Sequence, residues 1–333
     1  MKKFTGSSAL FLVAAIALLF FSRGPVLAAA APVVKIGYPQ PSGAQIPVWV
    51  IPEAKIDQRY GINVQVVYIS GGARLTQTLV SGDIQMAMTG GAVVNGILSG
   101  AELVYIAIGV PTYGFSVYAR PEVKDIAELK GKVLGVMTKG ASSDHAATAL
   151  LRQHGLKAGQ DVKFLYLGGV KEVVAALDKG IIPAGVLSSP TTLVARRLGH
   201  KELVNIGTLN LPYIHNGIVT RRSLVRQNPE LVKNFLKAYV EAIRITREEP
   251  EIAKKALARF LATQDKSIID EAYESFRPLF PKVPYLNDDI VRSVLAVTDH
   301  PKAATADPKE FYDNRFLKEL EDSGFIKEVY TRK

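Results

Sequence analysis

The chain has 333 residues, a formal net charge of +10 and no cysteine. A chain of this length exceeds what one hydrophobic core usually supports, so we expect two domains. Without cysteine it has no residue for a structural disulfide or a lipid anchor, and its basic residues occur in pairs such as Arg196-Arg197 without interleaved aromatic residues, so we expect no nucleic-acid partner.

The first thirty residues have the order of a secretory signal peptide. Lys2 and Lys3 precede an apolar run over 9–21, and an alanine-rich stretch follows over 28–31. The apolar run is shorter than the roughly 20 residues that cross a bilayer as a helix. We therefore expect a cleaved signal peptide over 1–30 and a soluble periplasmic protein, with an uncleaved membrane anchor as the alternative.

From residue 33 onward, short β-runs alternate with helical runs, and each β-run ends in a turn of small and polar residues. The strands expected in the first part are 33–38, 62–69, 84–88 and 103–110. The helices expected between them are 47–60, 74–81 and a segment that ends at Leu98. Strands separated by helices of this length indicate an α/β fold with a mainly parallel sheet.

After 117–121 the alternation of short β-runs and helical runs begins a second time. The second series contains expected strands at 133–137, 162–167 and 184–187, and expected helices at 146–154 and 170–179. This repetition predicts a second lobe with the architecture of the first.

After a strand-like stretch over 214–220 the chain is helical. Asn228 is expected to cap a helix that has Pro229 at its first position and carries an apolar stripe as far as Ile243. Pro250 opens another helix. We expect this C-terminal region to pack on one lobe rather than to form a third domain.

The turns after the strands are the expected binding site, because ligands of open parallel sheets bind beyond the carboxyl ends of the strands. Glycines let the backbone approach a ligand, and free N–H groups at helix starts carry partial positive charge. The expected ligand-binding residues are Ser42, Gln45, Gly72, Arg74, Thr89, Gly90, Tyr113, Lys139, Gly140, Ser142, Ser143 and Ser188.

Two cations make an anionic ligand plausible at these turns. The turn over 139–144 combines a lysine, hydroxyl groups and backbone N–H donors at one helix start, which suits an anion. The alternative is an ordinary helix start capped by serine and aspartate. Arg74 stands in the first turn of its helix, where it could contact an anion or be solvated.

The sequence offers no catalytic constellation. Ser142, Ser143, Asp144 and His145 are consecutive, so their side chains diverge from a helix start and cannot form a triad by themselves. The five histidines are scattered, and neither a zinc-ligand pair nor a nucleophile-elbow or phosphate-loop motif occurs. We therefore expect no enzyme activity, no metal and no cofactor.

Several segments resemble periplasmic nitrate-, sulfonate- and taurine-binding proteins of ABC transporters, a superfamily that also includes proteins similar to thiamine-pyrimidine synthases. The resemblance rests on the segments 81–87, 126–136, 139–145, 175–180 and Asn228-Pro229. It implies a two-lobed type II periplasmic-binding-protein fold, with lobe I over 32–118 and 215–333 and lobe II over 119–214.

The resemblance also implies a function. The lobes would close on a small anionic or zwitterionic solute such as a sulfonate, nitrate or taurine, and the closed substrate-binding protein, expected to be a monomer, would dock on an ABC permease and its ATPase. Two alternatives remain open at this point, namely the ligand-binding subunit of a sensor and an exported enzyme on the same fold.

Overall fold

The computed structural model describes residues 1, 30–209 and 211–332. Residues 2–29 of the expected signal peptide lie outside the described residues. From Pro32 onward the chain forms one compact unit. Among the described residues, no helix combines the length and the apolar character that a membrane crossing requires.

The first sheet contains five strands in the order β2-β1-β3-β10-β4. Their bounds are β1 Val33–Tyr38, β2 Asn63–Tyr68, β3 Met86–Thr89, β4 Leu103–Thr112 and β10 Pro212–Arg221. β1 pairs in parallel with β2 and β3, whereas β10 is antiparallel to both β3 and β4. Four strands therefore run in one direction and β10 runs against them.

The second sheet repeats this arrangement in the order β7-β6-β8-β5-β9. Its strands are β5 Ser116–Ala119, β6 Val133–Val136, β7 Lys163–Tyr166, β8 Ala184–Leu187 and β9 Lys201–Asn205. β5 is antiparallel to both of its neighbours, and the other four strands share one direction. In this sense the expectation of mainly parallel sheets is confirmed.

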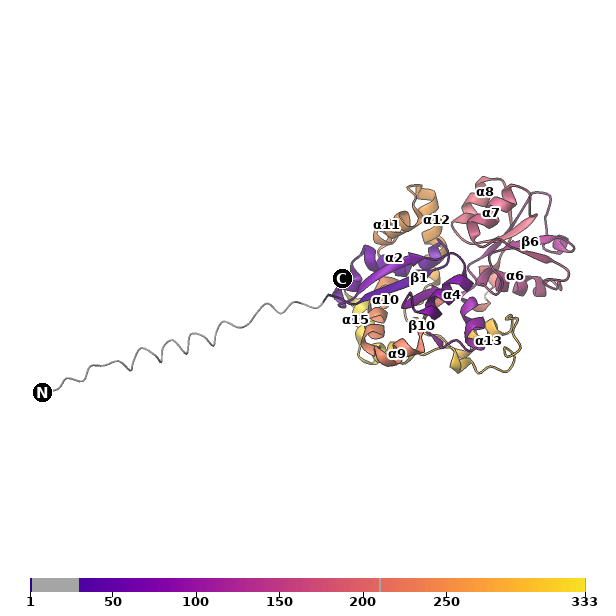
Figure 1. Ribbon diagram of the computed structural model, residues 1–333. Coiled ribbons are helices and arrows are strands. Elements are labelled where there is room, and N and C mark those ends of the chain that lie inside the picture. Colours follow the sequence, from indigo (N-terminus) through magenta and orange to yellow (C-terminus); the bar gives the residue numbers. More distant parts are fainter. Residues whose placement is uncertain (2–29, 210, 333) are drawn as a thin grey trace. The chain divides into compact units, whose positions relative to one another are not determined.

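The chain crosses twice between the two sheets. In each sheet the antiparallel strand is the one that has just arrived from the other sheet, since β5 follows β4 and β10 follows β9. We call the first sheet with its helices the first lobe and the second sheet with its helices the second lobe. Figure 1 shows α6, α7 and α8 around β6, and α2, α4 and α10 around β1 and β10.

Helices flank both sheets. In the first half of the first lobe they are α2 Ile46–Glu53, α3 Ile56–Arg59, α4 Gly72–Ser81 and α5 Ala92–Leu98. In the second lobe they are α6 Ser142–Gln153, α7 Val170–Asp178 and α8 Thr191–Arg197. The C-terminal helices are α9 Arg222–Gln227, α10 Pro229–Glu248, α11 Pro250–Leu261, α12 Lys266–Phe276, α13 Asp288–Leu295, α14 Arg315–Asp322 and α15 Phe325–Thr331. Short 3-10 turns are η1 Gly43–Gln45, η2 Ala127–Leu129, η3 Ile206–Leu209, η4 Arg277–Leu279 and η5 Pro308–Glu310.

Most elements lie where the sequence pattern places them, and the differences have local causes. The helix expected over 47–60 is divided into α2 and α3, because Lys55 takes a left-handed conformation with a φ of 53°. The helix expected over 146–154 begins earlier, at Ser142. The helix at Pro229 is present, but the Asn228 side chain makes no capping hydrogen bond.

The hydrophobic core that the described residues form has three parts: one inside the first lobe, one that continues between the lobes, and a smaller one inside the second lobe. In the first part, α10 and α11 pack against α2, so that Trp49 is fully buried and stacks on Phe260. The C-terminal helices therefore pack on the first lobe, as the sequence predicts. The part between the lobes extends from Leu75 of α4 through Tyr213 to Leu134 of β6.

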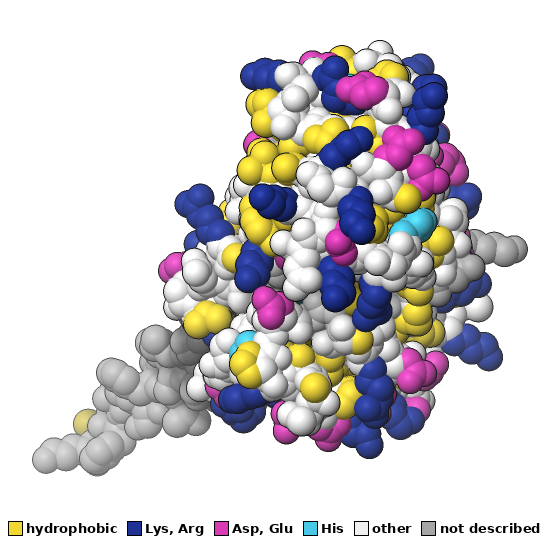
Figure 2. Space-filling view, turned by 90° about the vertical axis from the view of Figure 1, so that its right-hand side faces the viewer, with side chains coloured by type: hydrophobic (Ala, Val, Ile, Leu, Met, Phe, Trp, Pro, Cys, Tyr) yellow, Lys and Arg dark blue, Asp and Glu magenta, His cyan; other side chains and the backbone are white. Residues whose placement is uncertain are grey.

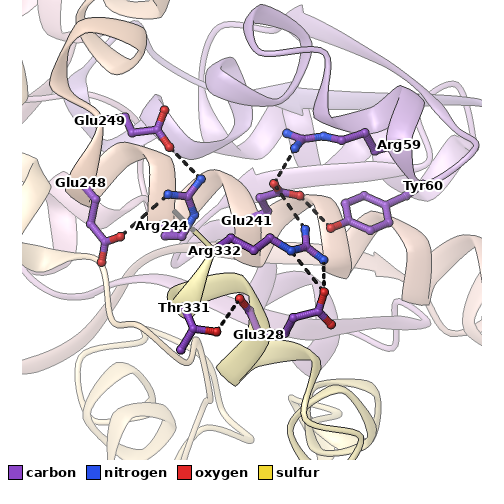
Figure 3. Close-up of polar contacts among 9 residues, drawn as sticks. All are labelled: Arg59, Tyr60, Glu241, Arg244, Glu248, Glu249, Glu328, Thr331 and Arg332. Carbon is purple, nitrogen blue, oxygen red and sulfur yellow. Dashed lines mark hydrogen bonds and ion pairs between the residues drawn. The ribbon is translucent and has the colours of Figure 1, made fainter.

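A buried carboxylate holds the C-terminal end of the chain against α10 (Figure 3). Glu241 of α10 has a side chain that is 1% exposed, and the Tyr60 hydroxyl donates a hydrogen bond to it at 2.7 Å. Arg59 pairs with it at 2.8 Å and Arg332 at 3.8 Å. Arg332 directly follows α15, so one carboxylate connects α3, α10 and the C-terminal end.

Candidate functional site

A small cavity lies where strand ends of both lobes meet. It has a volume of about 30 Å³, which is room for about two water molecules. We call it the inner cavity. Its lining residues are Pro39, Gln40, Gln45, Gly72, Thr89, Gly90, Gly91, Ala92, Phe115, Met137, Ala141, Ser142, His215 and Asn216. They come from the turns after β1, β3 and β6, from the start of α4, from the first crossing and from β10.

Two buried side-chain amides line this cavity, and their oxygen atoms have no partners. Gln40 is 5% exposed and Gln45 is 1% exposed, and both line the cavity. The Oε1 atoms of both side chains have no hydrogen-bond partner among the described residues. Buried polar groups are normally hydrogen-bonded, so these two oxygens are available to a bound molecule.

The other polar side chains of the inner cavity have protein partners. Asn216 accepts a hydrogen bond from the Val110 N–H at 2.9 Å and donates one to the Ala44 carbonyl oxygen at 2.8 Å. His215 accepts one from the Gly114 N–H at its Nδ1 atom, at 3.1 Å. Burial lowers the pKa of His215 to about 3, so the ring is neutral at physiological pH and its Nε2 atom carries the proton.

The start of α6 in the second lobe contacts the first lobe directly. The Ser142 hydroxyl donates a hydrogen bond to the His215 carbonyl oxygen at 2.9 Å and accepts one from the Gly91 N–H at 3.4 Å. A Cβ atom on Gly90 would overlap the Ser142 hydroxyl and the His215 carbonyl oxygen. The glycine is therefore required by the close approach of the lobes.

A buried histidine lies next to this contact. His145 of α6 is 2% exposed, and its Nδ1 atom is 2.8 Å from the Tyr213 hydroxyl. Tyr213 in turn stacks on Tyr113, with ring centroids 4.0 Å apart. Burial lowers the pKa of His145 to about 4. This pair adds a second polar contact between α6 and the strand β10.

Two larger hollows lie on either side of the interface, one toward α8 and one toward α6. The α8-side cavity has a volume of about 310 Å³ and shares Phe115 with the inner cavity. Its polar lining includes Ser188, Thr192, Arg196 and Glu271. The α6-side groove has a volume of about 910 Å³, with Asn95, Lys139, Asp144, Lys163 and Tyr166 among its lining residues.

Ion pairs connect the lobes at the rims of these hollows. Arg196 of α8 pairs with Glu271 of α12 at 2.8 Å, and Arg197 pairs with Asp265 at 2.7 Å. On the α6 side, Lys139 pairs with Asp299 at 3.3 Å. The two lobes are thus in contact along both edges of the interface.

The structure brings five of the expected site residues together and separates the others. Those that line the inner cavity are Gln45, Gly72, Thr89, Gly90 and Ser142. Tyr113 and Ser188 line the α8-side cavity, and Lys139 and Gly140 line the α6-side groove.

Three expected residues line none of these hollows. Ser42 is buried and accepts a hydrogen bond from the Ala44 N–H at 3.3 Å. Ser143 is buried and accepts one from the Met137 N–H at 3.0 Å. Arg74 is exposed on α4.

In the expected anion turn over 139–144, Ser142 bonds to the first lobe, whereas Asp144 bonds within the turn. The Asp144 carboxylate accepts a hydrogen bond from the Gly140 N–H at 2.6 Å, and Lys139 faces Asp299 rather than the inner cavity. Burial raises the pKa of Asp144. The N-cap residue of α6 is Ala141, and no side chain forms a capping hydrogen bond at this helix start, so the turn is not an ordinary serine and aspartate cap either.

Sequence reasoning did not single out several residues of the inner cavity. They are Gln40, Gly91, Phe115, Met137, His215 and Asn216. Gln40 stands in the turn after β1, so the rule about strand ends would have found it. His215 and Asn216 lie inside β10, which reaches the cavity along its length. Within the described ranges, no group of three or more His, Asp or Glu side chains has the arrangement of a metal site.

Solved structures share this fold. The alkanesulfonate-binding protein SsuA from Xanthomonas axonopodis pv. citri, bound to MOPS, aligns with a TM-score of 0.70 at 20% identity over 85% of this chain and 97% of that chain. The periplasmic nitrate-binding protein NrtA from Synechocystis PCC 6803 aligns with a TM-score of 0.71 at 15% identity over 88% and 89%. The fold is that of periplasmic binding proteins.

The sequence identifies the family. A protein of Brachyspira hyodysenteriae, whose name places it among ABC transporter periplasmic binding proteins, is 24% identical over 246 residues, 69% of this chain and 70% of that protein. Residues 58–253 match the model of the NMT1/THI5-like family. This match covers more than half of the chain, which therefore belongs to that family. The expected relationship to periplasmic binding proteins and the two-lobed α/β fold are confirmed.

Proposed function

We propose that the mature chain is the periplasmic receptor that captures one small solute for an ABC importer. The observation that carries the proposal is the inner cavity, where two buried amide oxygens without partners line a space between the lobes. A solute that contacts both lobes binds the closed arrangement better than an open one, and this difference drives closure. Such a role needs no reaction of the solute, so we propose a binding protein rather than an enzyme.

The lobe division expected from the sequence is part of this proposal, with lobe I over 32–118 and 215–333 and lobe II over 119–214. The strand bounds support crossings between the lobes a few residues earlier than these limits. β5 of the second sheet already begins at Ser116, and β10 of the first sheet already begins at Pro212. The protein would be exported with loss of 1–30 and would bind its permease as a monomer.

The surface charge supports a receptor without a nucleic-acid partner. Figure 2 shows Lys and Arg side chains spread over one face, with Asp and Glu side chains between them. Nucleic-acid binding proteins instead gather their basic residues into a patch or a stripe. The net positive charge of the chain is thus distributed rather than focused on that face.

A thermal-shift screen tests the proposed function. The mature protein would be mixed with oxyanions, sulfonates, carboxylates, amides and pyrimidines, since a solute that binds only the folded state raises the Tm. We expect one class to raise the Tm and to reduce the radius of gyration in small-angle scattering. The Gln45→Leu variant should lose both effects. A screen in which no class has either effect would contradict the proposal.

A further inference from the structure

We propose that the inner cavity selects an uncharged head group that both donates and accepts hydrogen bonds, such as an amide or a sulfonamide, over the anion of the same shape. This inference rests on the proposed receptor function and names the chemistry of the same site. It differs from the anionic solute that the sequence leads one to expect, and three observations support it.

The first observation is the charge of the lining. Within the described part of the chain, no residue that lines the inner cavity carries a charge at neutral pH, because His215 is held neutral by burial. The two cations expected to hold an anion lie elsewhere, since Arg74 is exposed on α4 and Lys139 pairs with Asp299. Burial of an ion without an opposite charge is costly. The starts of α4, α5 and α6 line the cavity, but they offer an anion only the partial positive charge of their N–H groups and no full charge.

The second observation is the balance of donors and acceptors. The unpartnered Oε1 atoms of Gln40 and Gln45 are acceptors, whereas the Ser142 hydroxyl and the Asn216 amide already donate to carbonyl oxygens. The donors of the lining are the His215 Nε2–H group, the Thr89 hydroxyl and the side-chain NH2 groups of the two glutamines, of which that of Gln40 contacts Ser42. A carboxylate or sulfonate offers acceptors only and would leave both glutamine oxygens unpaired. An amide-type group offers N–H donors to them and an oxygen to the histidine.

The third observation is size. The inner cavity has room for about two water molecules, so only a head group of a few atoms fits inside it. Phe115 lines both this cavity and the α8-side cavity of about 310 Å³. The rest of a larger solute would therefore lie against Phe115 on the α8 side, outside the uncharged cavity.

The experiment compares pairs of probes that differ in charge but not in shape. Acetamide is compared with acetate, and methanesulfonamide with methanesulfonate, by titration calorimetry at pH 7.5 and by thermal shift on the mature protein. We expect the neutral member of at least one pair to bind at least tenfold more tightly than its anion. The wild-type comparison requires no variant, so a variant that fails to fold cannot obscure it.

Three variants locate the binding. Gln45→Leu and Gln40→Leu remove the unpartnered acceptors and should each weaken the neutral probe tenfold or more. Arg74→Ala is the matched control outside the cavity and should leave the neutral probe unchanged.

The outcomes separate the inference from the receptor function. If an anion binds more tightly than its neutral partner and Gln45→Leu abolishes that binding, the receptor function stands and the uncharged head group is wrong. Loss of anion binding in Arg74→Ala would equally overturn the inference in favour of a site at α4. If neither member of either pair binds, the proposal of an uncharged head group is also wrong. The thermal-shift screen described above then tests the receptor function by itself.

Discussion

Glu241 is a buried carboxylate whose partners all come from other segments of the chain. Replacement by glutamine keeps its size but removes the charge that faces Arg59 and Arg332. Both arginines are partly exposed, which reduces the penalty, so we expect Glu241→Gln to lower the free energy of unfolding by about 1–3 kcal/mol. Glu328→Gln, at an exposed pair with Arg332, is the control and should cost less than about 0.5 kcal/mol. Equal losses in denaturant titrations would contradict this account.

The buried histidines predict a loss of stability in acid. Burial holds the pKa of His145 near 4 and that of His215 near 3, below the value of about 6.5 in an unfolded chain. Between pH 6.5 and 4 the unfolded chain therefore binds protons that the folded chain does not. The free energy of unfolding is highest above this window and should fall by about 1.4 kcal/mol per pH unit for each histidine as the pH decreases.

The His145→Gln variant isolates one of these contributions. Denaturant titrations at pH 7, 6 and 5 should show a smaller loss of stability for the variant than for the wild type. The difference between the two slopes should approach about 1.4 kcal/mol per pH unit. If the two curves run parallel, the histidine does not titrate on unfolding as its burial implies.

Gly90 lies at a close contact between the two lobes, where no side chain fits. A Cβ atom there would overlap groups of both lobes, including the Ser142 hydroxyl. We expect Gly90→Ala to hold the lobes apart, to increase the radius of gyration in solution scattering and to cost about 1–3 kcal/mol of stability, as is usual for overpacking. A scattering curve that superimposes on that of the wild type would show that the lobes do not approach in this way.

The sequence could predict those cavity residues that lie near strand ends and not those inside strands. Gln45 lies in η1 after β1, and Thr89 is the last residue of β3, so both are near strand ends that the pattern of apolar runs indicates. His215 reaches the cavity only because β10 is inserted antiparallel between β3 and β4, and such long-range pairing leaves no local trace. Arg74 is the reverse case of a residue that was expected at the site but does not line it. Its position at a helix start suggested a contact with the ligand, but that position does not show that the side chain is exposed.

At the scale of elements, the contact between α8 and α12 predicts a dependence on salt. Arg196 pairs with Glu271 across the lobes, and Arg197 holds the pKa of Asp265 well below its usual range through their hydrogen bond. Exposed ion pairs are screened by salt. We expect the affinity for solute to fall a few fold between 0.05 M and 0.5 M NaCl, and the Arg196→Gln, Arg197→Gln double variant to lose this dependence. An unchanged salt dependence in the variant would mean that closure does not use these pairs.

The sequence did not indicate β5 and β9, which have four and five residues. β6, β7 and β8 are equally short, but each ends at a turn of small and polar residues before a helix, and this pattern indicates a strand. α2 and α3 were expected as a single helix, because a left-handed residue such as Lys55 is rarely indicated by its side chain. Long elements with a sustained apolar stripe, such as α10, were predicted well.

For the whole molecule, the core predicts one unfolding transition. The cluster that contains Leu75 of the first lobe also contains Leu134 and Val186 of the second. Loss of either lobe would expose the apolar surface of the other, which couples their unfolding. Scanning calorimetry of the mature protein should therefore show a single peak whose van't Hoff and calorimetric enthalpies agree. Two resolved peaks would show that the lobes unfold independently.

The double crossing of the chain has a consequence for the order in which the protein can form. The strands of the second sheet all lie between residues 116 and 205, whereas the first sheet lacks its inner strand β10 until residue 212 has been made available. In a chain that emerges from a channel with its N-terminus first, β3 and β4 both lack the strand β10, which pairs with each of them, until residues 212–221 have emerged. The second lobe can therefore complete its sheet before the first, although the first lobe begins earlier in the sequence.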